Sequence, residues 1–167
     1  AAGMGSPRTP APHVVFLLLE STPAKALHCY GNPHPDVTPN LDRLAAEGIR
    51  FEHCVAPSSS SSCSVVSMAT SLYMMRGSRF DYFRDISFPF LTLPRALKLG
   101  GYELALFSSG NETFDRINQF IRPADFDTYF SQDTSANPQP DVMRMDDRIA
   151  VGEFEKWLAG RTDPRPF

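Results

Sequence analysis

The stretch Val14-Val15-Phe16-Leu17-Leu18-Leu19-Glu20-Ser21 decides the fold class of this sequence. Six consecutive apolar residues, rich in branched side chains, suit a strand buried on both faces of a parallel sheet. The run is too short to span a bilayer as a helix. Ligands of open α/β sheets bind just beyond the carboxyl ends of the strands. Glu20 follows the apolar run, so its carboxylate is placed to bind a metal ion or to contact a phosphate-like ligand. The alternative role for Glu20 is that of a solvated strand end.

The composition of the 167 residues is that of an ordinary globular protein, with 42% hydrophobic and 21% charged residues. The length suffices for one domain with a substantial core. The formal net charge is −3 and no cluster of Lys and Arg is present, so no nucleic-acid partner is expected. Residues 1–12 are expected to form a flexible segment ahead of a domain that spans residues 13–167.

Strands and helices are expected to alternate along the chain, which predicts an α/β fold with parallel strands. We expect two strands besides the opening run, at residues 49–55 and 102–107, and a long loop over Pro123–Asp141. Helix start and stop signals predict five helices, at residues 39–47, 65–72, 93–99, 114–121 and 147–158.

A run of five serines, Ser58 to Ser62, lies between the strand expected at 49–55 and the helix that follows. The N-terminus of a helix attracts anions through its unpaired amides and its dipole. A serine hydroxyl at this position is placed to attack a phosphoryl or sulfuryl centre. The alternative is a flexible linker whose serines only cap the helix.

Asn111 and Glu112 follow the strand expected at residues 102–107. They are therefore candidates for lining a substrate cleft at the carboxyl end of that strand. Capping of the next helix explains the same two residues equally well.

Five segments, together with the dipeptides Tyr30-Gly31 and Ala56-Pro57, carry a resemblance to a known family: Leu18–Ser21, Thr38–Phe51, Ser67–Tyr73, Leu93–Gly110 and Asp146–Phe167. They resemble the N-terminal part of the sulfatase-like branch of the alkaline phosphatase superfamily, and the sequence TPNLDRLAAEG at Thr38–Gly48 is the most specific match. The resemblance covers nearly all of the chain from His13 on. It implies a three-layer αβα fold with a mostly parallel sheet, incomplete at its C-terminal end, and thus the N-terminal portion of a catalytic domain.

The same resemblance implies a divalent metal ion, with zinc as the first choice and manganese, calcium or magnesium as alternatives. Sulfatases carry two aspartates where this chain has Glu20 and Ser21. A single glutamate ligand resembles instead the phosphotransferases of the phosphoethanolamine and lipoteichoic-acid type. The metal ligands implied here are Glu20 and Ser61.

The catalytic nucleophile implied by the resemblance is Ser61, counted back from the matching segment that begins at Ser67. Cys63 then occupies the proline position and Val65 the arginine position of the sulfatase formylglycine motif, so this motif is broken. Metal bound between Glu20 and Ser61 would activate the hydroxyl.

Other nucleophiles remain open. A register slip of one or two residues would make Ser60 or Ser62 the nucleophile. A Cys63 thiolate at the helix N-terminus is a further, less favoured alternative.

The function implied is that of a metal-dependent hydrolase or transferase acting on an anionic phosphate or sulfate ester, with phosphotransferase chemistry favoured. A serine-type sulfatase is the alternative within this class. The rival is an inactive relative that serves as a binding or assembly module, because no histidine follows His53 and no Asp-His pair is present. An extracytoplasmic location, periplasmic or membrane-associated, is expected, with any membrane attachment carried by segments outside these residues.

Overall fold

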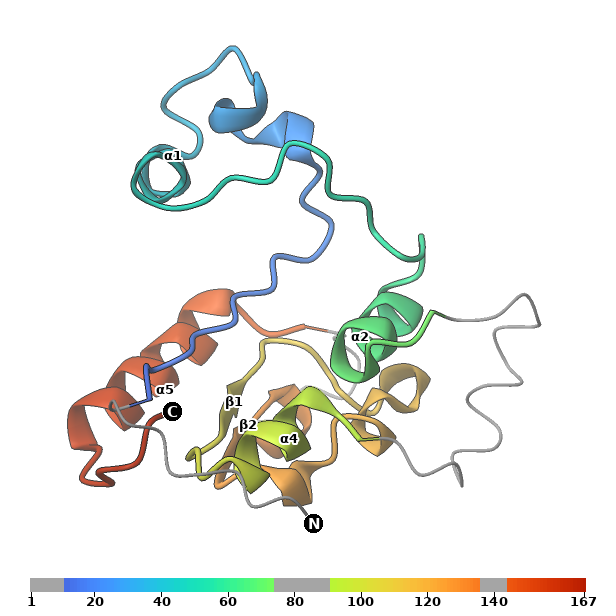
Figure 1. Ribbon diagram of the computed structural model, residues 1–167, viewed down its shortest axis with the longest axis vertical. Coiled ribbons are helices and arrows are strands. Elements are labelled where there is room, and N and C mark those ends of the chain that lie inside the picture. The colour runs from blue at the N-terminus through green and yellow to red at the C-terminus, as the bar shows by residue number, and fades with distance from the viewer. Residues whose placement is uncertain (1–10, 74–90, 136–143) are drawn as a thin grey trace. The chain divides into compact units, whose positions relative to one another are not determined.

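The computed structural model describes residues 11–73, 91–135 and 144–167 (Figure 1). The chain divides into two compact units. One unit combines the residues up to Val15 with Pro57–Phe167, and the other is Phe16–Ala56. The flexible segment predicted for residues 1–12 lies almost wholly outside the described residues and remains a prediction.

The unit formed by Phe16–Ala56 contains one α-helix, α1, and two 3-10 helices. Their bounds are Pro39–Glu47 for α1, Ala24–Ala26 for η1 and His28–Tyr30 for η2. Helix α1 starts at Pro39 and ends before Gly48, as predicted, because proline fits the first helical turn and a residue without Cβ suits the end.

Side-chain hydrogen bonds tie η2 to α1. Thr38 occupies the N-cap position of α1, but its hydroxyl accepts the backbone N–H of His28 at 3.0 Å instead of capping the helix. The carboxylate of Asp42 accepts the backbone N–H of Cys29 at 2.8 Å. The sequence therefore predicted the start of the helix correctly, but the Thr38 hydroxyl binds the backbone of η2 and does not cap α1.

Two predicted strands are absent from the described residues. Val14–Leu19 has no regular secondary structure, and its six side chains are 45–69% exposed. Residues 49–55 form no strand either, and they are exposed. Apolar runs and alternation show which residues suit a strand, but a strand also needs neighbours that accept and donate its backbone hydrogen bonds. The Val14 N–H donates to the Phe167 carbonyl at 2.6 Å, but no strand forms along these two segments among the described residues.

The unit that contains Pro57–Phe167 holds three α-helices, three 3-10 helices and two strands among its described residues. The α-helices are α2 (Ser61–Thr70), α4 (Leu93–Leu99) and α5 (Asp147–Gly160). The 3-10 helices are η3 (Phe114–Gln119), η4 (Pro123–Asp125) and η5 (Gln132–Thr134).

Side-chain caps fix the starts of α4 and α5. The Thr92 hydroxyl accepts the backbone N–H of Arg95 at 3.3 Å, and the Asp146 carboxylate accepts that of Arg148 at 2.9 Å. The sequence predicted that helices start at residues 93 and 147, and both starts are confirmed. A short polar side chain before each helix satisfies an otherwise unpaired amide.

Two short parallel strands, β1 (Ala105–Phe107) and β2 (Thr128–Phe130), form the sheet of the described residues. Leu106 pairs with Tyr129 at the centre of the register. Strand β1 confirms the predicted strand at residues 102–107, although it is shorter. The prediction of an unbroken loop over Pro123–Asp141 was wrong, because β2 lies within it.

Aromatic contacts pack helix α5 against β1. The Phe107 ring centre lies 5.7 Å from that of Phe154 and 5.8 Å from that of Trp157. Phe154 and Trp157 are three residues apart and therefore share one face of the helix. This apolar face explains why a 14-residue helix is stable in this position.

Helix α2 packs against α4 and η3. It contributes three of the buried apolar residues of this unit, Cys63, Val66 and Ala69, and η3 contributes Ile117. The first turn of α2 is thereby fixed by the core that the rest of the helix joins.

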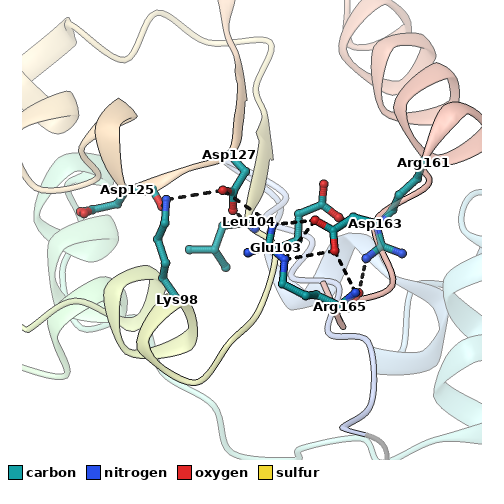
Figure 2. Close-up of polar contacts among 8 residues, drawn as sticks. All are labelled: Lys98, Glu103, Leu104, Asp125, Asp127, Arg161, Asp163 and Arg165. Atoms are coloured by element: carbon teal, nitrogen blue, oxygen red, sulfur yellow. Dashed lines mark hydrogen bonds and ion pairs between the residues drawn. The ribbon is translucent and has the colours of Figure 1, made fainter.

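A buried ion pair joins Glu103, two residues before β1, to Arg161, the residue directly after α5 (Figure 2). Arg161 Nε donates to Glu103 Oε2 at 2.5 Å, and the two side chains are 12% and 11% exposed. The guanidinium also stacks over the Phe167 ring, with 4.8 Å between its central carbon and the ring centre. Burial protects this pair from screening by solvent.

A second carboxylate, that of Asp127, connects the amino ends of β1 and β2. It accepts the backbone N–H of Leu104 at 2.9 Å, and it lies 3.7 Å from Lys98 Nζ and 3.9 Å from the Arg165 guanidinium. Figure 2 shows these groups together with the Arg161 pair. Charged groups from α4, β1, β2 and the C-terminal segment thus meet at one end of the sheet.

The α/β fold class with a parallel sheet, predicted from the sequence, is confirmed. None of the helices in the described part of the chain is both long enough and apolar enough to cross a membrane.

We predict that the substitution Arg161→Met destabilises the protein by about 3–5 kcal/mol, because it leaves the Glu103 carboxylate buried without its partner. Arg148→Met is the matched control, since Arg148 is 90% exposed in its pair with Asp146 and such pairs contribute less than about 1 kcal/mol. Chemical denaturation of the full-length protein measures both. If the two variants lost the same free energy of unfolding, the buried Arg161–Glu103 pair would not have the stabilising role proposed here.

We also predict that Asp163→Asn destabilises the protein in a pH-dependent way. Hydrogen bonds from Arg165 lower the pKa of Asp163 to about 2. The native state therefore holds this proton less tightly than the unfolded chain, in which an aspartate titrates near pH ~4. The stabilising contribution is complete above that pH and disappears as the pH falls toward 2. Denaturation midpoints of the two proteins should converge below pH ~4; a constant difference down to pH 2 would refute this.

Candidate active site

Helix α2 begins at Ser61, directly after the serine run. Ser60 is the N-cap residue, yet its hydroxyl makes no capping bond and lies 3.0 Å from the hydroxyl of Ser62. The Ser58 hydroxyl accepts the backbone N–H of Ser60 at 3.1 Å and closes a turn before the helix. The N-cap side chain thus does not cover the first turn, whose dipole and amides suit an anionic ligand.

Burial distinguishes the serines that the sequence left as alternatives. Ser61 is exposed, Ser60 is half-buried, and Ser62 is only 1% exposed. Cys63, the alternative thiol nucleophile, is also buried, at 7% exposure. Among Ser60, Ser61, Ser62 and Cys63, Ser61 is thus the residue in the exposed class.

Glu20 lies in the other unit, in a tight turn of its own. Ser21 adopts a left-handed backbone conformation with φ of 55°, and its hydroxyl donates to the Glu20 carboxylate at 3.0 Å. The Thr22 hydroxyl donates to the Glu20 carbonyl at 3.3 Å. The carboxylate is exposed, so it is accessible to a ligand from solvent.

The residues expected to bind metal do not form a complete metal site. Within residues 11–73, 91–135 and 144–167, no three side chains of His, Cys, Asp or Glu lie close enough together to hold a metal ion. Catalytic zinc takes about three protein ligands and a water molecule. Glu20 and Ser61 supply one carboxylate and one hydroxyl, so we derive no catalytic step through a metal.

Polar residues gather at the carboxyl ends of the paired strands. Ser108 follows β1, and Ser131 and Asp133 follow β2. The Ser108 hydroxyl donates to the Glu112 carboxylate at 2.5 Å, while the backbone N–H of Glu112 donates to Asp133 at 3.2 Å. The Ser131 hydroxyl donates to the same Asp133 oxygen at 2.7 Å. The structure therefore joins the two strand ends through Glu112.

Asn111 lies beside Glu112 on the loop after β1. Its side-chain oxygen accepts the backbone N–H of Thr113 at 2.9 Å and the Thr113 hydroxyl at 2.5 Å. These contacts fix the loop directly before η3, whose N-cap residue is Thr113 and which has no side-chain cap, so the capping role that the sequence offered as an alternative is not seen for Asn111. The substrate-binding role of Asn111 and Glu112 remains a prediction.

Burial shifts the pKa values of two residues at the carboxyl ends of the strands, Glu112 and Tyr129. It raises the pKa of Glu112, an effect that the Ser108 hydrogen bond opposes and the nearby Asp133 carboxylate reinforces. Burial also raises the pKa of Tyr129 to about 12, with Glu112 as the next contribution. The Tyr129 hydroxyl is buried and has no hydrogen-bond partner in the described part of the chain. A carboxyl group in this environment holds its proton more tightly than an exposed glutamate.

Sequence reasoning missed Ser131 and Asp133, because they fall in the segment Pro123–Asp141 that was expected to be a loop. The sequence signal that could have revealed these two residues is the β-forming triplet Thr128–Phe130, which polar residues follow.

Ser61, Asn111 and Glu112 lie in one unit, where α2 packs against η3, the helix that follows the Asn111 loop. Glu20 belongs to the other unit.

Comparisons with known proteins agree with this architecture. The family model described as Sulfatase matches residues 12–167. The chain is 31% identical over 98 residues to an N-acetylglucosamine-6-O-sulfatase of Bacteroides thetaiotaomicron, a match covering 59% of this chain and 17% of that protein. It is 36% identical over 69 residues to human Arylsulfatase H, covering 41% of this chain and 12% of that protein. No solved structure matches.

The chain therefore belongs to the sulfatase family. The matched segments span less than a fifth of the length of either relative. Members of this family are metal-dependent, which supports a divalent metal ion in general terms.

We predict that Glu112→Gln becomes more stable relative to the natural protein as the pH rises from 4 to 7. Because burial raises the pKa of Glu112, the native state binds this proton more tightly than the unfolded chain does. Ionisation of the natural residue therefore costs stability as the pH rises through the unfolded pKa of about 4.3 toward the higher folded value. The amide of glutamine avoids this cost and still accepts the Ser108 hydrogen bond.

Denaturation midpoints at several pH values measure this difference. Glu155→Gln is the matched control for the removal of a carboxylate, since Glu155 is an exposed residue of α5. A stability difference for Glu112→Gln that does not change between pH 4 and pH 7 would exclude a raised pKa.

Proposed function

We propose that this chain is the N-terminal part of the catalytic domain of a hydrolase or transferase that acts on phosphate or sulfate esters. Ser61 is the nucleophile in this proposal, and phosphoryl transfer is the favoured reaction. Membership of the sulfatase family supports the general class. The choice of phosphoryl transfer and the role of each residue are our inference.

The exposed position of Ser61 at the N-terminus of α2 carries the proposal. A nucleophile must reach its substrate, which Ser61 can do and Ser62, at 1% exposure, cannot do without rearrangement. Helix α2 has ten residues and a buried face, so its first turn is fixed in place. Its positive end favours the anionic oxygens of a phosphate or sulfate group next to that hydroxyl.

The proposed reaction has two displacements at the same centre. The Ser61 oxygen forms a bond to phosphorus as the ester bond to the leaving alcohol breaks, the serine proton is lost, and the alcohol oxygen takes up a proton. Water or a second alcohol then attacks the phosphoserine, and the Ser61 oxygen is released. Two displacements allow the same site to act as a hydrolase or as a transferase.

Glu20 is the residue proposed to contribute a carboxylate oxygen to the metal site of the complete protein. When bound, a divalent metal ion would screen the charge of the substrate and stabilise an ionised hydroxyl. Such ions prefer oxygen or nitrogen donors, a preference that an exposed carboxylate satisfies. Zinc remains the first choice by resemblance to the single-glutamate phosphotransferases.

A serine-type sulfatase is the second candidate, and the names of both relatives favour it. Position 61 holds serine, while the nearby Cys63 is buried and stands where the sulfatase motif has proline. An unmodified serine favours phosphoryl transfer, and a serine converted to formylglycine would favour sulfate ester hydrolysis. The substrates chosen for the assay separate the two.

We predict that Ser61→Ala in the full-length protein reduces kcat by on the order of 10⁴-fold or more, because the covalent step is lost. Turnover is measured with p-nitrophenyl phosphate, bis(p-nitrophenyl) phosphate and p-nitrophenyl sulfate in the presence of zinc or manganese. Phosphate substrates should be preferred. Circular dichroism and denaturation confirm that the variant is folded.

Ser60→Ala is the matched control, because Ser60 is the adjacent half-buried alternative. Full activity of Ser61→Ala, or loss of activity only in Ser60→Ala, would exclude Ser61 as the nucleophile. Turnover of the sulfate ester alone would favour the serine-type sulfatase. No turnover of any substrate, together with no metal binding, would favour the non-catalytic binding or assembly module.

A further inference from the structure

The short helix η3 and the turn that follows it surround an open hollow in the surface. Its volume is about 490 Å³, which is within the range of roughly 300–1,000 Å³ that is typical of small-molecule sites. Two arginines, two amide side chains, a proline and an alanine line it: Arg116, Asn118, Gln119, Arg122, Pro123 and Ala124. The hollow belongs to the unit that also carries Ser61.

The polar side chains that line the hollow are cationic or neutral. Arg116 and Arg122 are exposed, and no Asp or Glu lines the hollow among the residues whose side chains the structure describes. A guanidinium group donates N–H groups in a fork that fits two oxygens of a phosphate or sulfate. The side-chain amides of Asn118 and Gln119 can donate to hydroxyl groups and accept from them. This donor set suits an anionic group carried on a sugar or another polyol.

A third arginine lies on the other side of the same wall. Gln119 and Arg122 also line a smaller hollow, together with Arg95 of α4. Asp125 is the acidic residue of this smaller hollow. Arginines from η3, from the turn before η4 and from α4 therefore leave a positive excess around Arg122 in the described part of the chain.

Contacts within the unit fix the wall of the hollow. The backbone N–H of Asn118 donates to the Glu112 carbonyl at 2.8 Å, and Phe120, at 3% exposure, anchors the end of η3 in the core. Arg122 Nε donates to the Gln119 carbonyl at 3.3 Å. Recognition groups that are already held in place lose less conformational freedom when a ligand binds.

The backbone of Arg116 is unusual. Its φ of 58° lies in the left-handed region, which is costly for a residue with a side chain and is enriched at ligand sites. The Arg116 N–H donates to the Thr113 carbonyl at 3.0 Å, which holds this conformation. The strained residue is thus one that lines the hollow.

We propose that this hollow is a subsite for a second anionic group of the substrate, a phosphate or sulfate ester carried on a saccharide or polyol. The proposal rests on the proposed function, in which Ser61 acts on one such ester. Helix η3 packs against α2, the helix that begins at Ser61, so a ligand with several anionic groups can extend from one place to the other. The substrate class is therefore a polyanion and not an isolated monoester.

Calorimetric titration of the full-length protein tests the subsite with two sugar-sized polyanions, sucrose octasulfate and myo-inositol hexakisphosphate. Arg122→Gln should weaken the binding of the preferred polyanion on the order of 10-fold, because a charge-assisted, forked contact is lost. Sucrose and myo-inositol, which carry no charge, should not bind measurably. The polyanion that binds more tightly shows whether the subsite takes a sulfate or a phosphate.

Arg148→Gln is the matched control, since it removes an exposed guanidinium of α5 that does not line the hollow. Arg116→Gln is the second variant and should weaken binding by a factor similar to that of Arg122→Gln. Equal weakening by Arg148→Gln and Arg122→Gln would indicate a general attraction between charges and overturn the subsite. Failure of the natural protein to bind either polyanion would overturn it as well.

The variant Ser61→Ala separates this proposal from the proposed function. Titration needs no turnover, and the Kd of the polyanion should be unchanged in this variant, because Ser61 does not line the hollow. A loss of affinity as large as that of Arg122→Gln would place the polyanion at the reacting serine and overturn the subsite. Turnover by Ser61→Ala tests the proposed function alone, so either proposal can fail while the other stands.

Discussion

The pairing of β1 with β2 is the constraint on which the larger unit depends. Because the two strands are parallel, their amino ends meet at one edge and their carboxyl ends at the other. Charged groups such as Glu103 and Asp127 bind partners at the amino end. The carboxyl end carries Ser108, Glu112 and Asp133, joined by hydrogen bonds. One pairing therefore separates a stabilising end of the sheet from an end suited to ligand binding.

Local signals in the sequence predicted the helices well and the strands poorly. Caps such as Thr92 and Asp146 act within one turn, so the residues that form them are adjacent in the sequence. Strands depend on partners far along the chain. Val14–Leu19 is apolar yet forms no strand in the described residues, whereas the triplet Thr128–Phe130 does so because β1 lies beside it.

The sequence predicted individual residues of the candidate site but not the contacts between them, because those contacts join residues that are far apart in the chain. The serine run before a helix indicated a hydroxyl nucleophile, the family resemblance implied that it is Ser61, and Ser61 is exposed whereas Ser62 is buried. Glu112 was expected to line the site, but its bond to Asp133 could not be predicted, since it joins residues 21 positions apart across two strands. The position of Glu20 after the apolar run indicated a ligand-binding carboxylate, and the resemblance implied that its ligand is a divalent metal ion.

Identification of the covalent intermediate tests the central claim most directly. The full-length protein would be mixed with p-nitrophenyl phosphate, quenched in acid within the first turnovers and digested, and the modified peptide sequenced by mass spectrometry. The account predicts one added phosphoryl group on Ser61. A phosphoryl group on Ser60, Ser62 or Cys63, or turnover of the substrate with no modified peptide, would contradict it.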